Sequence, residues 1–240
     1  MPKTIEQSIQ LHREWVAETL DAARRWKSQN NRGQELFCLY HALQNSLCVA
    51  VSDYETPELG IEYLKSEFKP KVFNRTLELI RQLQSDGDIR SENIGSPGIF
   101  KLVLTVHSAW LLDLYAEAKE IASICDDKEQ MRFYQRGGLW SDYAQGITAV
   151  AFRRQFTPKQ KKYKGYDRHY AVYLQLMADI CIGNELSSAI TAVDQSFSQR
   201  NRDKRLINEG LDGDGTFPVK WDFRKHSLLL AAGHNSTNGE

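Results

Sequence analysis

The chain is 240 residues long, and its 41% hydrophobic and 26% charged residues are ordinary for a soluble globular protein. This length suffices to bury a hydrophobic core without disulfide bonds. Lys plus Arg equals Asp plus Glu, at 31 each, so the formal net charge is zero. That balance argues against nucleic acid as the main partner, because phosphate binding normally requires a basic domain or stripe.

The cysteines and the apolar runs indicate a cytoplasmic protein. Cys38 and Cys48 fall on one helical pattern about 15 Å apart along the axis, which is too far for a disulfide. No cysteine has zinc-site spacing, so all four, including Cys125 and Cys181, are interpreted as buried free thiols of a reducing compartment. The N-terminus lacks a signal-peptide core, and no apolar run is long enough to cross a membrane, so we expect no membrane partner.

The first half of the chain is predicted to be helical. Apolar residues recur at helical spacing over Thr4 to Gln29, and Gln34 to Val51 is apolar nearly all round. Asn30 to Gly33 is the predicted stop between these two helices. Two further helices are predicted over Glu58 to Ser66 and over Pro70 to Gln84. The polar, glycine-rich stretch 85–98 is a possible sub-bundle boundary inside a single domain of residues 1–240.

The second half continues the helical pattern. One long helix is predicted over Ile99 to Cys125, and small residues at Ala144, Gly146 and Ala149 would let another helix approach closely. The remaining predicted helices are Lys128 to Arg136, Leu139 to Arg154, Gly165 to Ile182 and Asn184 to Gln199. No strand pattern competes with them. The sequence therefore predicts an all-α fold, a multi-helix bundle or an irregular helical-hairpin array of about 8–10 helices.

A basic run lies between two of these helices. It carries interleaved tyrosines and consists of Lys159, Lys161, Lys162 and Lys164. One interpretation is a patch for an acidic protein partner or for nucleic acid, with aromatic stacking. The other is a solvated loop, which the zero net charge favours.

The densest charged cluster lies near the C-terminus. Its members are Arg200, Arg202, Asp203, Asp212, Asp214, Trp221, Asp222 and Arg224. The arginine forks could bind these carboxylates internally and tie the last helix to the body of the protein. The same residues could instead face a partner, or Asp212 and Asp214 could share a metal ion, although no third or fourth ligand is visible.

Trp221 and Phe223 flank Asp222 just before a final apolar run. Their simplest interpretation is an aromatic anchor for the terminal helix. Tryptophan and arginine are also frequent hot-spot residues at protein interfaces, so the sequence leaves both roles open.

Known catalytic motifs are missing from the sequence. It contains no phosphate-binding GxxxxGK loop, no HExxH and no GxSxG. We therefore expect no catalytic residues, no cofactor, no metal and no enzymatic activity. The alternatives are a helical metal-dependent hydrolase or nuclease that uses Asp212, Asp214 and Asp222 or the pair Asp126 and Asp127, and a helical-repeat scaffold that binds peptides.

The helical body closes in RNRDKRL, then DGDG, then PVKWDFR. In this respect the chain resembles bacterial immunity proteins of polymorphic toxin systems, most nearly their Imm49-like helical group. The resemblance implies a cytoplasmic protein that binds and neutralises a cognate toxin from a contact-dependent or type VI secretion system. It also implies that the protein has no chemistry of its own.

Overall fold

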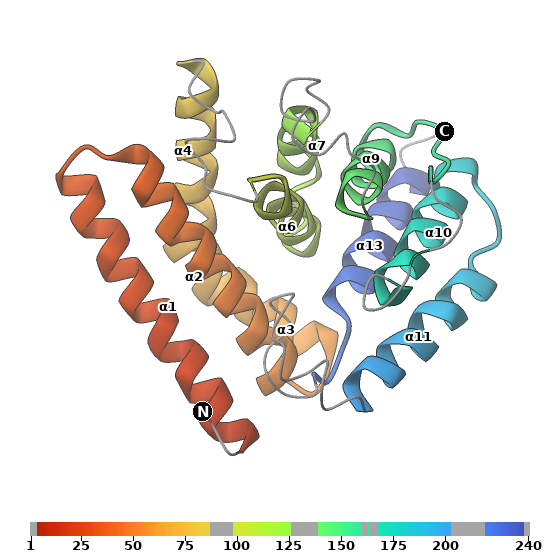
Figure 1. The fold of residues 1–240 in the computed structure, drawn as a ribbon, viewed down its shortest axis with the longest axis horizontal. Helices are drawn as coiled ribbons and strands as arrows, with labels where there is room; N and C mark the ends of the chain where they lie inside the picture. The colour runs from red at the N-terminus through yellow and green to blue at the C-terminus, as the bar shows by residue number, and fades with distance from the viewer. Residues whose placement is uncertain are drawn as a thin grey trace. The chain divides into compact units, whose positions relative to one another are not determined.

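The computed structural model describes residues 4–86, 98–125, 139–159, 163, 168–202 and 219–237, and every secondary-structure element in that part is a helix (Figure 1). The predicted all-α class is confirmed. The chain divides into two compact units, the first formed by Met1–Gly98 with Ile207–Trp221 and the second by Ile99–Leu206 with Asp222–Glu240. No helix among the described residues has both the length and the apolar character needed to cross a bilayer.

The first unit opens with two long helices, α1 (Ile5–Ser28) and α2 (Arg32–Asp53), which lie side by side in Figure 1. The Thr4 side chain caps α1 by accepting a hydrogen bond from the Gln7 amide at 3.2 Å. The helix ends where Asn30 adopts a left-handed backbone with φ of 55°. The residue that ends α1 is therefore an asparagine. Gly33 was predicted to belong to the segment between the two helices, but it lies in the first turn of α2.

The next three helices run without a break, as α3 (Pro57–Tyr63), the π-helix η1 (Leu64–Phe73) and α4 (Asn74–Ser85). The prediction of two helices separated before Pro70 is wrong. Proline lacks an N–H group and clashes with the carbonyl four residues earlier in an α-helix. The wider π turn relieves this conflict, and the buried Leu64, Phe68 and Val72 hold η1 in place.

A buried ion pair joins α2 to α4. Glu35 is 2% exposed, and it accepts two hydrogen bonds from the Arg75 guanidinium, at 2.7 Å from Nε and 3.0 Å from Nη2. This two-pronged geometry raises the pKa of Arg75. Neither residue stood out in the sequence.

The C-terminal part of the chain returns to the first unit through Val219–Trp221, here called the return segment. The carbonyl oxygens at the end of α2 accept its hydrogen bonds: the Lys220 amide donates to Val51 at 2.8 Å, the Lys220 ammonium to Asp53 at 3.0 Å, and the Trp221 indole to Ala50 at 3.1 Å. Helix ends leave such carbonyls without intrahelical partners. The sequence grouped Trp221 with the terminal helix, whereas the structure places its indole against α2.

The second unit contains six described helices, which are α6 (Gly98–Leu111), α7 (Tyr115–Cys125), α9 (Leu139–Phe152), α10 (Arg168–Ile182), α11 (Ser187–Arg202) and α13 (Phe223–Thr237). The predicted single helix over Ile99 to Cys125 is wrong, because it is broken between α6 and α7. At the break Asp113 has φ of 60°, and the Leu114 amide donates to the Ala109 carbonyl at 2.8 Å. This left-handed ending usually employs glycine or asparagine, so the break was not foreseen.

Gly146 of α9 lies directly against α10. A Cβ atom at this position would overlap the Met177 sulfur and come within 3.0 Å of the Phe156 ring. The predicted close approach of a second helix at Gly146 is confirmed.

Candidate functional site

Asp222 forms the N-terminal cap of α13 inside the second unit. Its Oδ1 accepts hydrogen bonds from the amides of Arg224 at 3.0 Å and Lys225 at 3.1 Å, and its Oδ2 accepts one from the Tyr173 hydroxyl at 2.6 Å. Burial and then the charge of Asp222 raise the pKa of Tyr173 well above its ordinary value, so the phenol stays a donor. Both carboxylate oxygens are thus engaged within the fold.

Two predicted arginines pack around Tyr170. Arg200 and Arg224 are 6% and 1% exposed. The Arg200 Cζ lies 5.8 Å from the Tyr170 ring centre and 5.3 Å from that of Phe197. The Arg224 Cζ lies 5.0 Å from the Tyr170 ring and 4.5 Å from that of Phe223. Aromatic faces attract the guanidinium charge and more strongly when water is excluded, so both arginines help to bind α11 and α13 to α10.

A third polar group, His107 of α6, was not singled out from the sequence. It is fully buried, with Nδ1 at 2.6 Å from the Ser227 hydroxyl and Nε2 at 3.1 Å from the Tyr143 hydroxyl. Burial, followed by the charge of Arg224, lowers the pKa of His107 well below its ordinary value. A serine beside a histidine can form a nucleophilic pair. Here neither side chain reaches solvent, so the arrangement is structural.

Two residues of the basic run, Lys159 and Tyr163, belong to the part of the chain that the structure describes. Asp142, which is 2% exposed, accepts the Lys159 amide at 3.0 Å and the Tyr163 hydroxyl at 2.5 Å on one carboxylate oxygen. The buried carboxylate therefore holds the backbone at the start of the run. The other predicted members, Lys161, Lys162 and Lys164, lie outside the described residues.

Several predicted residues cannot be placed in a site. Arg202 closes α11 with its side chain outside the described part, and Asp203, Asp212 and Asp214 lie outside it altogether, as do Asp126 and Asp127. Asp194 of α11, another acidic residue of this charged stretch, is placed, and it pairs with Lys225 of α13 at 2.6 Å. Within the described ranges no three His, Cys, Asp or Glu side chains come together as a group that could hold a metal ion.

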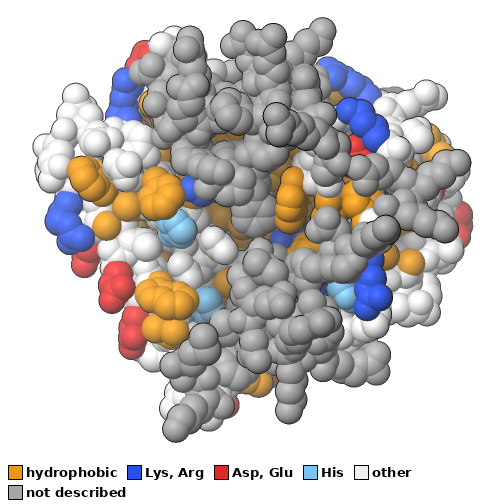
Figure 2. Space-filling model, viewed as in Figure 1, with side chains coloured by type: hydrophobic (Ala, Val, Ile, Leu, Met, Phe, Trp, Pro, Cys, Tyr) orange, Lys and Arg blue, Asp and Glu red, His pale blue; other side chains and the backbone are white. Residues whose placement is uncertain are grey.

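The first unit exposes two large aromatic side chains, Trp15 of α1 and Phe37 of α2, each beside a histidine of its own helix, and we call these two side chains the α1–α2 aromatic face. Figure 2 shows hydrophobic side chains beside histidines over these two helices. Trp15 and Phe37 are 39% and 37% exposed. Their rings meet His12 and His41 edge-on, with centroids 5.3 and 4.6 Å apart. The buried His12 is held in turn by Asn45, whose side-chain oxygen lies 2.8 Å from Nδ1.

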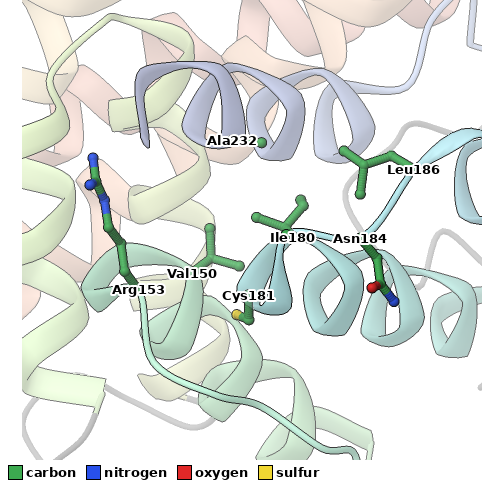
Figure 3. A pocket seen from close by; sticks show the side chains of 8 residues that line it. Val150, Arg153, Ile180, Cys181, Asn184, Leu186 and Ala232 are labelled. Atoms are coloured by element: carbon green, nitrogen blue, oxygen red, sulfur yellow. The ribbon is translucent and has the colours of Figure 1, made fainter. Parts of the chain in front are cut away.

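The second unit contains a pocket of about 330 Å³ where α9 and α10 end (Figure 3). Its lining is mixed: Val150, Ile180, Leu186 and Ala232 are aliphatic, and Arg153, Gly183 and Asn184 also contribute to it. Cys181 also lines it. All four cysteines are thiols outside any disulfide, as predicted, and Cys38, Cys48 and Cys125 are buried. Cys181 is only partly buried, contrary to the prediction, because it lies at this opening.

Comparison with protein-family models, curated proteins and solved structures found no match to this chain.

Proposed function

We propose that this chain is an immunity protein, which binds a cognate bacterial protein toxin in the cytoplasm and neutralises it through a protein–protein interface. The resemblance of its C-terminal stretch to polymorphic-toxin immunity proteins supports this function. The toxin would come from a contact-dependent or type VI secretion system. The protein would need no catalytic group of its own.

The observation that carries the proposal is the α1–α2 aromatic face. Large rings exposed to water are typical anchors of protein interfaces. The edge-on contacts of Trp15 with His12 and of Phe37 with His41 restrict the orientation of both rings before a partner arrives. Such preorganisation lowers the entropy that binding costs.

The burial of the charged residues near the C-terminus also favours the α1–α2 aromatic face as the interface. Arg200, Asp222 and Arg224 are at most 6% exposed, so a partner could reach them only after the second unit opened. We therefore propose that the interface lies on the first unit and that these three residues stabilise the second.

The function is tested first with the full chain as bait in the native host. We expect one stoichiometric partner, encoded beside it, that is toxic when expressed alone and harmless when this chain is co-expressed. A captured protein without toxicity, or toxicity that this chain does not relieve, would overturn the immunity function.

The face is tested separately, with Trp15→Ala and Phe37→Ala. Each is expected to weaken toxin binding by about 2 kcal/mol, roughly 30-fold, and to reduce protection in cells, when measured at a temperature at which the variant is fully folded. Ile182→Ala is the matched control, because Ile182 is an aliphatic side chain 54% exposed on the second unit. If toxin binding survives both aromatic variants, the toxin docks elsewhere while the immunity function still holds.

A further inference from the structure

We propose that the end of α2 and the neighbouring α3 form a binding site for a lysine–tryptophan pair, and that a second copy of this chain occupies it by exchanging its return segment. In the structure the site is occupied by the return segment of the same chain. In the exchanged pair, each copy would contribute its Lys220 and Trp221 to the site of the other. This association is independent of toxin binding.

The site is shaped for an indole ring. Trp221 is 4% exposed, and its Nε1 donates to the Ala50 carbonyl at 3.1 Å. Ala50 lies in the last turn of α2, where carbonyl groups have no partner within the helix. A Cβ atom at Gly60 would lie 2.4 Å from a carbon of the indole ring, so glycine alone leaves room for the ring without a shift. Both the acceptor and the space are therefore specific for this side chain.

The same site selects a cation beside the indole. The Lys220 amide donates to the Val51 carbonyl at 2.8 Å, and its ammonium group bonds to the Asp53 carbonyl at 3.0 Å and to the Glu55 carboxylate at 2.5 Å. A helix C-terminus carries about half a negative charge, which adds to the charge of Glu55. A lysine directly before a tryptophan meets both requirements, and the return segment contains the two residues in this order.

These contacts do not depend on which copy supplies the return segment. The residues that form the site belong to the Met1–Gly98 part of the first unit. The described helices before and after the return segment along the chain, α11 and α13, belong to the second unit. A second copy offers the same carbonyl groups, the same carboxylate and the same glycine. Exchange of an identical element between copies keeps the native contacts and is therefore a low-cost route to a dimer.

The sequence contains a connector for the exchange. Residues 85–98 join the first unit to the second, and their composition is polar and rich in glycine, as is typical of the segments that connect domains. Trp221, by contrast, is followed directly by Asp222, the cap of α13. A copy that lends its return segment therefore lends its second unit as well, and the exchanged dimer pairs each first unit with the second unit of the other copy.

The population of the exchanged dimer follows from the effective concentration of a segment on a short linker, which is about 1 mM. Because the closed and exchanged forms share the same contacts, about half of the chains should be in dimers after refolding at about 1 mM. After refolding at about 10 μM, about one chain in fifty should be in a dimer.

The test unfolds an equal mixture of isotope-labelled and unlabelled full chain in urea, refolds it at these two concentrations and counts the dimers by native mass spectrometry. We expect mixed-label dimers at the higher concentration that keep their copies after dilution, because separation requires both return segments to leave their sites. Monomers alone at both concentrations would overturn the proposal. So would dimers that trade copies within minutes without urea, since these would form by surface contact between folded chains.

A complementary pair of variants locates the contact. Gly60→Leu fills the site and Trp221→Ala removes the indole, so neither variant has a matching site and segment of its own. Refolded together, they should form a heterodimer about tenfold in excess of either homodimer, because the segment of the first variant fits the site of the second.

Gly233→Leu replaces Gly60→Leu in the matched control. It changes a glycine in open space and keeps both site and segment, so no excess of heterodimer is expected with Trp221→Ala. An equal yield of heterodimer from the two mixtures would contradict the assigned site. Refolding of the wild-type chain needs neither variant and decides the proposal if one of them does not fold.

Discussion

Both oxygens of the Asp222 carboxylate are engaged, by two amides of α13 and by the Tyr173 hydroxyl. Asp222→Ala removes a helix cap worth about 1 kcal/mol and leaves a buried hydroxyl unpaired at about 2 kcal/mol. We expect urea denaturation to show a loss of about 3 kcal/mol in the free energy of unfolding. Asp222→Asn keeps one oxygen to cap α13 and places its NH2 group as a donor towards the Tyr173 hydroxyl oxygen, so it should recover the capping part of the loss.

The control for this prediction is Asp194→Ala. Asp194 also bonds to α13, through Lys225, but its side chain is 49% exposed. Exposed ion pairs contribute at most about 1 kcal/mol, so this variant should resemble the wild type. Equal losses for the two variants would show that burial of Asp222 does not determine its contribution.

The lowered pKa of the buried His107 leads us to expect that the free energy of unfolding depends on pH. Burial keeps its pKa in the folded state well below 6.5, the ordinary value that the unfolded chain retains. As the pH falls below 6.5, the unfolded state therefore binds a proton that the folded state does not, and stability decreases. The stability is fully present above this pH and is lost towards pH 5, at no more than about 1.4 kcal/mol per pH unit for one proton.

Urea denaturation at several pH values between 7.5 and 5 measures this slope. His107→Gln should be less stable overall but should lose stability less steeply with acid. His12, whose pKa burial also lowers, remains in the variant and accounts for a residual slope. An unchanged slope in His107→Gln would show that another group titrates.

At the scale of elements, two glycines should respond in opposite directions to alanine. A methyl group at Gly60 of α3 would overlap the Trp221 indole and lie 2.9 Å from the Ala50 carbonyl oxygen, two groups that are hydrogen-bonded to each other. Gly60→Ala should therefore cost about 1–3 kcal/mol. At Gly233 of α13 the space is open, and alanine should add about 0.5–1 kcal/mol of stability.

Thermal denaturation distinguishes the two glycine variants by the sign of the change in melting temperature. A rise for Gly60→Ala would mean that α3 shifts away from the indole at little cost. A fall for Gly233→Ala would mean that the new methyl group meets an atom outside the described part of the chain.

The helices were largely predictable because each depends on local spacing of apolar residues. Two helix boundaries, at Asp113 and at Pro70, were not predictable. Both depend on backbone conformations that are unusual for the residue types found there. Asp113 takes a left-handed conformation without being glycine, and Pro70 is accommodated by a π-helix. Sequence rules describe the usual behaviour of aspartate and proline, and packing overrides them at these positions.

At the scale of the molecule, the polar interior and the return of Val219–Trp221 to the first unit could not be predicted. Asp222 and Arg200 lie in a charged stretch whose pattern fits an exposed surface as well as internal ion pairs. His107 lies in an apolar run, where nothing in the sequence distinguishes it from an ordinary core residue. Burial of these groups depends on partners far away in sequence, such as Tyr173 and Ser227.

The return segment has a consequence for how the protein is made. The Trp221 indole and its acceptor, the Ala50 carbonyl, are 171 residues apart, so α2 emerges from the ribosome long before its terminal carbonyls can be covered. At about 5–20 residues per second, the delay is on the order of ten to thirty seconds. Throughout that interval the first unit is incomplete, and its α2 end is exposed to chaperones or to the same segment of another chain.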